Sequence, residues 1–261
     1  MWIAGALLCV AAVAGFFYMR HTRNELHAMI GTETLPIPEL ERLRGISDEL
    51  GAKGSFRKVA EVVGAAYPRP EGLLTAELSK TECVWFRYEV KRHYETVEYR
   101  DGKRHRVKRT ENVAGHTSWE GYALIDEQGR TIGVDPNGTK PDAVEQTVSR
   151  FEPHNGGGGS VELFGFKLPQ FVVGGGSTTI GYDYKEWAIR PGRRLYILGE
   201  VHDRIGPLVV GKPENGGHYL ISTRTEQELR DDRVKRHRFL AVGVIAGALI
   251  GIVLIVADVL T

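Results

Sequence analysis

The sequence predicts a mainly β fold, an antiparallel OB-like barrel or sandwich, flanked by two transmembrane α-helices. An uncharged apolar stretch lies near each end of the chain, and between them short runs of β-branched and aromatic residues are separated by Gly, Pro and Asp. The composition, 42% hydrophobic and 26% charged, is typical of a folded chain and excludes both disorder and a wholly membrane-embedded transporter.

The first apolar stretch runs from Trp2 to Met19 without a charged residue. Its 18 residues are close to the length that crosses a hydrocarbon core about 30 Å thick. We therefore expect transmembrane helix 1 over residues 1–19. Ala12-Val13-Ala14 resembles a signal-peptide cleavage site, but Arg20 and Arg23 follow the apolar run instead of preceding it, which favours an uncleaved anchor.

Residues 20–50 are expected to form a juxtamembrane stalk and an amphipathic helix. The stalk has no helix breaker before Gly31. In the segment from Pro38 to Leu50, apolar residues such as Leu40 and Leu43 recur at helical spacing and form one apolar stripe.

Residues 51–222 are expected to form the β-rich domain. The predicted strands are Arg57 to Tyr67, Cys83 to Tyr99, Arg104 to Ala114, Trp119 to Asp126, Thr131 to Asp135, Ala143 to Glu152, Thr179 to Arg190, Leu195 to Val201, Leu208 to Val210 and His218 to Ser222. Asp101-Gly102 predicts a hairpin turn. A barrel is preferred to a sandwich because Gly64, Gly121 and Gly199 recur inside strands, where sharply coiled sheets bend.

The chain is expected to end with a charged helical stalk over residues 223–238, transmembrane helix 2 over residues 239–257 and a short tail over residues 258–261. Thr223 and Glu226 have the spacing of a capping box at the start of the stalk. Pairs of opposite charge four residues apart support the helix along its length.

Basic residues flank both spans on the side of the central domain; they are Arg20, Arg23, Arg233, Lys235, Arg236 and Arg238. By the positive-inside rule the protein lies in the cell membrane as a two-pass protein, with its central domain cytoplasmic and both termini outside.

Gly243, Gly247 and Gly251 recur every four residues in the second span. This spacing places them on one helix face, where another backbone can approach closely. We expect them to pack against the first span as an antiparallel hairpin, with a homodimer through the same face as the alternative.

The glycine runs 156–159 and 174–176 bracket an apolar piece, residues 161–173. Neither run has the spacing of a phosphate loop, so nucleotide binding is not expected. The apolar piece is interpreted either as a cover for the core or as a finger that touches the membrane.

No catalytic residue, metal site or cofactor is predicted. The chain has two cysteines, too few for a thiolate zinc site. Cys83 lies in an alternating run typical of a half-buried strand, and His116, Ser118 and Glu120 share a strand face without an adjoining nucleophile turn.

The candidate binding residues lie around the Asp101-Gly102 turn, where the segment from Lys91 to Arg109 carries an excess of positive charge. They are Arg100, Lys103, Arg104, Arg106, Lys108 and Arg109. One interpretation is a solvated hairpin tip. The functional interpretation is contact with anionic lipid headgroups or with an acidic membrane protein. Nucleic acid is not expected as a partner, since the overall net charge is only +1 and both spans hold the domain at the bilayer.

The segments Glu77–Val90 and Lys185–Glu200 resemble the GIDE domain of membrane-anchored mitochondrial RING ubiquitin ligases and their prokaryotic relatives. The layout, with a "beside-a-membrane" β domain between two spans, resembles that family over roughly residues 1–257. The resemblance implies an OB-like barrel that recognises a ligand near the bilayer. A RING needs eight Cys or His ligands, and the chain stops at Thr261 without them. The expected function is therefore a recognition or scaffold module without catalytic activity. The alternative is a ligase-family (E3-type) protein that acts only with a separate catalytic partner.

Overall fold

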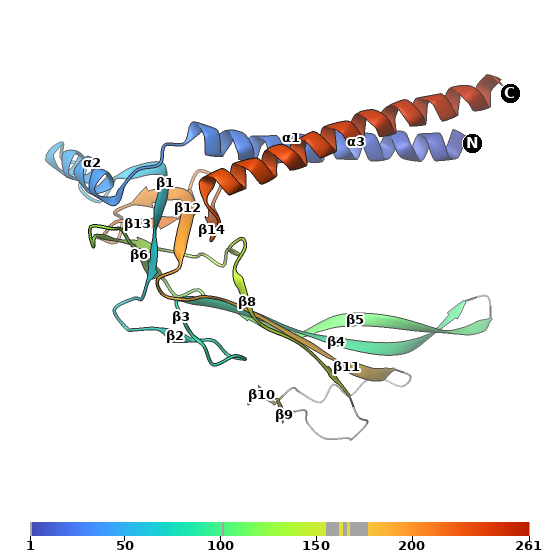
Figure 1. Cartoon of the computed structure of the whole chain (residues 1–261), viewed down its shortest axis with the longest axis horizontal. Helices are drawn as coiled ribbons and strands as arrows, with labels where there is room; N and C mark the ends of the chain where they lie inside the picture. The colour runs from blue at the N-terminus through green and yellow to red at the C-terminus, as the bar shows by residue number, and fades with distance from the viewer. Residues whose placement is uncertain (1, 101, 155–161, 164–165, 168–176, 261) are drawn as a thin grey trace.

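The computed structural model describes residues 2–100, 102–154, 162–163, 166–167 and 177–260. The apolar piece at 161–173 and both glycine runs fall wholly or mostly outside these residues, as does Asp101. The chain forms a small β-barrel from which two structures extend in the same direction, a pair of long helices and a separate twisted sheet (Figure 1).

The barrel has five strands and closes on itself. Its strands follow one another in the order β1-β6-β7-β13-β12, and β12 pairs back onto β1. Their bounds are β1 (Arg57–Tyr67), β6 (Tyr122–Ile125), β7 (Thr131–Val134), β12 (Arg194–His202) and β13 (Val209–Gly211). This closed barrel, in which the last strand lies between the third and the fourth, confirms the OB-like fold class. One pair, β7 with β13, is parallel, so the sheet is not wholly antiparallel as predicted.

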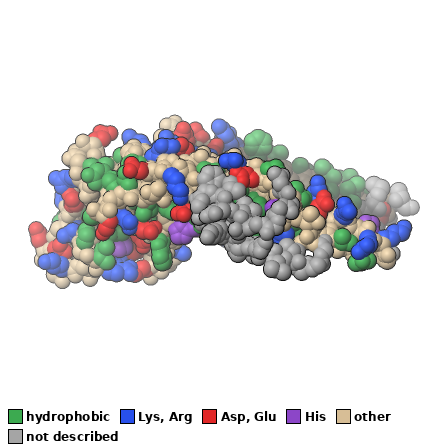
Figure 2. All heavy atoms as spheres, turned by 90° about the horizontal axis from the view of Figure 1, so that it is seen from below, with side chains coloured by type: hydrophobic (Ala, Val, Ile, Leu, Met, Phe, Trp, Pro, Cys, Tyr) green, Lys and Arg blue, Asp and Glu red, His purple; other side chains and the backbone are tan. Residues whose placement is uncertain are grey.

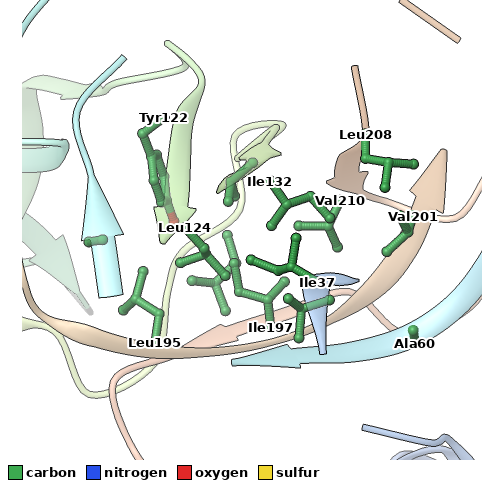
Figure 3. Packing of buried hydrophobic residues seen from close by; sticks show 14 of the residues in the cluster. Ile37, Ala60, Tyr122, Leu124, Ile132, Leu195, Ile197, Val201, Leu208 and Val210 are labelled. Atoms are coloured by element: carbon green, nitrogen blue, oxygen red, sulfur yellow. The ribbon is translucent and has the colours of Figure 1, made fainter. Parts of the chain in front are cut away.

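The barrel interior is filled by alternate residues of its strands, because side chains point to opposite faces in turn. Figure 3 shows Leu124, Ile132, Ile197 and Val210 converging from four strands. Helix α2 (Ile37–Glu49) closes one end, since its Ile37 and Leu40 join the same buried cluster. A helix inserted in this way removes the open barrel end from water.

The second sheet has four strands in the order β5-β4-β11-β8. They are β4 (Trp85–Arg100), β5 (Lys103–Thr117), β8 (Glu145–Pro153) and β11 (Thr178–Ile189). The β4–β5 pair is inserted between barrel strands β1 and β6, and β8 and β11 are inserted between β7 and β12. The predicted strands therefore divide between two bodies, and the single barrel or sandwich that we expected describes only the first.

Short strands complete the described chain. They are β2 (Leu74–Thr75), β3 (Glu82–Cys83), β9 (Glu162–Leu163), β10 (Phe166–Lys167) and β14 (Leu220–Ser222). β14 extends the barrel sheet at β12, immediately before the last helix. The last helix therefore starts at the barrel wall.

Helices α1 (Trp2–Gly31) and α3 (Glu226–Leu260) lie side by side and antiparallel, with both chain ends at the far end of the pair (Figure 1). Each is long and apolar enough to cross a membrane, α1 over Ile3–Arg20 and α3 within Glu226–Asp258. Both continue without a break into their charged parts, as the sequence predicted for the stalks.

The N-terminus of α3 differs from the predicted capping box. Thr225 and Glu228 form the box, with the Glu228 N–H donating to Thr225 Oγ1 at 3.3 Å and the Thr225 N–H to Glu228 Oε2 at 2.9 Å. Thr223 is used elsewhere, because its N–H donates to the Asp142 carbonyl and its hydroxyl to the Ala143 carbonyl. The predicted residue thus holds the chain to the barrel edge, and the helix starts two residues later.

Candidate functional site

A large open cavity of about 1080 Å³ lies on the outside of the barrel. We call it the barrel groove. Its floor is the outer face of β6 and β7, and its walls are the segment 67–71 after β1 and the segment 204–208 between β12 and β13. In an OB barrel this combination of the second and third strands with two flanking loops is where ligands bind.

The groove is open because its floor carries small residues. Gly121, Ala123 and Gly133 point outward, while the neighbouring Tyr122 points into the core. A Cβ added at Gly133 would lie 3.0 Å from Val209 Cγ2. Any larger side chain there would fill the floor.

The walls of the groove are apolar and stiff. Tyr67 is 45% exposed and Ile205 is 71% exposed, so both offer apolar surface to a ligand in the groove. Pro68, Pro70 and Pro207 also line the groove. Since proline fixes its backbone φ angle, these walls lose little conformational freedom on binding.

One end of the groove carries polar groups. Asp135 and His202 both approach Gly211, where an added Cβ would lie 3.9 Å from Asp135 Oδ2 and 3.9 Å from His202 Nε2. Burial, followed by the positive charges of Arg204 and Arg57, lowers the pKa of His202. Its imidazole is therefore neutral at pH 7 and can both donate and accept a hydrogen bond.

The predicted basic hairpin lies at the far end of β4 and β5, and its six cationic side chains are all exposed. Arg100 is paired with Lys103 across the turn. Gly102 has a φ of +73°, which the tight two-residue turn requires. The β5 residues alternate between faces, so each face of the hairpin presents cations.

Two of the six cations have partners in the described chain. Arg109 forms an ion pair with Glu98, and this hydrogen bond lowers the pKa of Glu98. The guanidinium of Arg104 lies over the Tyr99 ring, 5.6 Å from its centre. For Lys103, Arg106 and Lys108 the described residues provide no carboxylate within 4.0 Å. The hairpin tip thus keeps most of its positive charge unneutralised.

The helix-face glycines occupy different positions relative to α1. A Cβ at Gly251 would lie 2.8 Å from Cys9 Sγ and 2.9 Å from the Gly5 carbonyl oxygen. A Cβ at Gly247 would lie 4.0 Å from that of Ala12, and one at Gly243 would meet nothing within 4 Å. Of these three glycines, Gly251 is therefore the one in close contact with α1.

The residues considered for catalysis take part in packing and backbone hydrogen bonds. Cys83 is fully buried, and burial, with the charge of Glu186 next, raises the pKa of its thiol to about 12. Ser118 Oγ accepts a hydrogen bond of 2.9 Å from the Phe86 N–H, and the His116 ring lies beside Phe86. Within the residues that the structure describes, no three His, Cys, Asp or Glu side chains are grouped so as to hold a metal ion.

Sequence reasoning found the basic hairpin but missed the barrel groove. The groove residues come from segments more than a hundred positions apart, from Tyr67 to Val209, and only pairing of the strands brings them together. Two local signals were present: the Pro68 and Pro70 pair directly after a strand, and the two glycines Gly121, directly before β6, and Gly133, inside β7.

Comparison with known families gives one match. The GIDE family model, described as "E3 Ubiquitin ligase", matches residues 92–257, from the middle of β4 to the apolar part of α3. No curated protein matches, and no solved structure matches.

Proposed function

The chain belongs to the GIDE family, and from this premise we propose that it is a two-span membrane protein whose β domain is a membrane-proximal recognition or scaffold module. The family match and the two apolar helices support a membrane protein related to E3 ligases. The recognition role rests on one observation, the open barrel groove with its exposed Tyr67 and Ile205.

The groove favours a protein segment as its ligand. Its two arginines already face carboxylates, Arg204 with Glu214 and Arg69 with Glu71. Little positive charge is therefore left for a nucleic-acid backbone. Stiff apolar walls with polar groups at one end suit an extended peptide that buries apolar side chains and hydrogen-bonds at one terminus.

The membrane orientation that we propose rests on the basic residues that flank the apolar parts of α1 and α3. Because α1 and α3 are antiparallel, the basic residues next to both apolar parts lie on the barrel side. The positive-inside rule then gives a cytoplasmic β domain with both termini outside. A fluorescent protein that matures only in the cytoplasm, fused after Thr261, should stay dark; fluorescence would contradict this orientation.

A ligase-related role with a separate catalytic partner is the second candidate, and the family description favours it. The 261 residues contain two cysteines, so they hold no RING of their own. Under this alternative the groove would bring a substrate to another protein that recruits the conjugating enzyme.

A photo-crosslinking residue in place of Ile205 tests both candidates in native membranes. A scaffold gives one defined membrane partner, whereas the ligase-related role gives a RING-bearing or E2-like protein. The matched control is the same residue at Leu50, which is also highly exposed but lies at the end of α2 and does not line the groove. Identical products at both positions would contradict recognition through the groove.

A further inference from the structure

The helix pair and the four-stranded sheet start from the same body. β4 begins at Trp85, which is buried in the barrel core cluster. α3 begins beside the barrel, where its Leu229 packs against Tyr196 and Leu198 of β12. Figure 1 shows that from there both run in the same direction.

The β4 strand is longer than the charged part of α3 that separates the barrel from the apolar part of this helix. The charged part of α3, residues 226–238, extends about 20 Å from the barrel before the apolar part begins. The 16 residues of β4 extend about 53 Å at about 3.3 Å per residue. The outer half of the β4–β5 hairpin, beyond about Lys91, is therefore level with the apolar part of the helices.

Burial of the outer half of the β4–β5 hairpin in the hydrocarbon core of a bilayer would be strongly unfavourable. It carries the six exposed cations at its tip, and charged side chains within a bilayer face the protein interior or water. The open edge of β5 would also leave its backbone groups without hydrogen-bond partners in lipid. If α1 and α3 cross a bilayer, the hairpin has to turn toward the membrane plane.

The chemistry of the tip suits a headgroup layer. Lys and Arg lie on both faces of the hairpin, and in Figure 2 blue side chains gather at the end farthest from the barrel. Tyr99 is 68% exposed among them, with Arg104 over its ring. Tyrosine favours the membrane interface, and cations there attract anionic lipids.

We propose that the β4–β5 hairpin is a second membrane contact, whose cationic tip rests on the anionic headgroups of the bilayer that α1 and α3 cross. The proposal rests on the two-span function given above. It fixes the β domain at three points, two helices and a hairpin tip, and so gives the barrel groove a defined direction relative to the membrane. An acidic protein segment is the competing partner, and the test separates the two.

The test uses the full chain in lipid nanodiscs with an environment-sensitive dye at His105→Cys, a position near the tip outside the six cations. Cys9 is replaced by Ala, while the buried Cys83 needs no replacement because its protonated thiol does not react. Quenchers are attached to lipid headgroups. We expect several-fold stronger quenching in phosphatidylserine-containing discs than in pure phosphatidylcholine discs, and its loss at high salt.

Charge reversal provides the matched control. The triple variant Lys103→Glu, Arg104→Glu, Arg106→Glu should abolish the difference between the two lipids. The triple variant Lys53→Glu, Lys58→Glu, Lys212→Glu, which changes exposed lysines of the barrel, should keep it. Equal quenching in both lipids, or a response of the dye to an acidic polypeptide but not to anionic lipid, would overturn the proposal.

A second label separates this proposal from the two-span function. A dye at Leu249→Cys, exposed on α3, should be quenched by quenchers on the acyl chains. If that label is quenched and the hairpin label is not, only the hairpin contact fails. If the Leu249 label is not quenched, the two-span function itself fails.

Discussion

At the scale of single residues, Glu61 is the most unusual group. It is fully buried in β1, and its carboxylate accepts hydrogen bonds from Tyr196 of β12 and from Thr34 in the link between α1 and α2, the latter at 2.7 Å. Glu226 and Arg230 at the start of α3 face it as well. A single buried carboxylate of the barrel thus holds the link between α1 and α2 by a hydrogen bond and lies near the start of α3.

Burial is the main cause that raises the pKa of Glu61. A carboxyl whose folded pKa exceeds its unfolded value binds more protons when folded, so its contribution favours folding at low pH and is lost as pH rises through the folded pKa. We expect the melting temperature of the wild type, relative to Glu61→Gln, to rise as the pH is lowered from neutral toward the ordinary pKa of a glutamate carboxyl. Parallel curves for the two proteins across this range would contradict the prediction.

Gly133 is the residue that keeps the groove open. Gly133→Val places methyl groups against Val209 and fills the floor, which we expect to reduce crosslinking from position 205 at least tenfold while costing about 1–3 kcal/mol of stability. Gly45→Ala is the control, because nothing lies within 4 Å of its added Cβ and it is in a helix. It should retain crosslinking, and equal loss in both variants would show a general defect instead of a filled groove.

At the scale of elements, α1 and α3 approach each other closely where Gly5 and Gly251 meet. Gly251→Ile would force its side chain into Cys9 and the Gly5 carbonyl, so we expect a lower melting temperature in detergent and loss of crosslinks between the helices within one chain. Gly243→Ile, four residues from Gly247 in the same apolar span, meets open space and should change neither. If Gly243→Ile alone disrupts an oligomer, the glycine face serves a dimer.

The elements themselves were largely predictable from the sequence, and their division between two sheets was not. Local composition was enough to predict the first long helix and the basic hairpin. The apolar run of 18 residues from Trp2 and the hairpin around Gly102 are each formed by residues close together in the sequence. The barrel closes by pairing β1 with β12, about 135 positions away, as in Glu61 opposite Leu198. No local pattern specifies which distant strand β1 pairs with. For this reason the groove, which lies between loops far apart in the sequence, could not be predicted.

The same reason explains the error at the start of α3. The spacing of Thr223 and Glu226 fits a capping box as well as that of Thr225 and Glu228 does. Only the nearness of Asp142 and Ala143, which take the hydrogen bonds of Thr223, decides between the two. Non-local hydrogen bonding therefore shifted a boundary that local rules left ambiguous.

At the scale of the whole molecule, the architecture separates the apolar helix pair from the barrel and its groove. The helix pair provides the apolar surface, the barrel provides the groove, and the long sheet extends from the barrel in the same direction as the helix pair (Figure 1). The proposed scaffold needs no metal, whereas a RING folds around two zinc ions. Zinc content therefore distinguishes a recognition module from a protein that carries its own catalytic domain.

For the purified 261-residue chain we expect well under one zinc ion per molecule by elemental analysis, and no change in melting temperature on adding a chelator. The two cysteines lie in different elements, Cys9 in an apolar helix and Cys83 in the buried interior of the β domain. The described His, Cys, Asp and Glu residues form no group that could hold a metal. Structural zinc contributes directly to folding free energy, so its removal would lower stability measurably. One zinc ion or more per molecule, together with a melting temperature that falls on adding a chelator, would contradict the scaffold proposal. The ligase-related role would then be favoured.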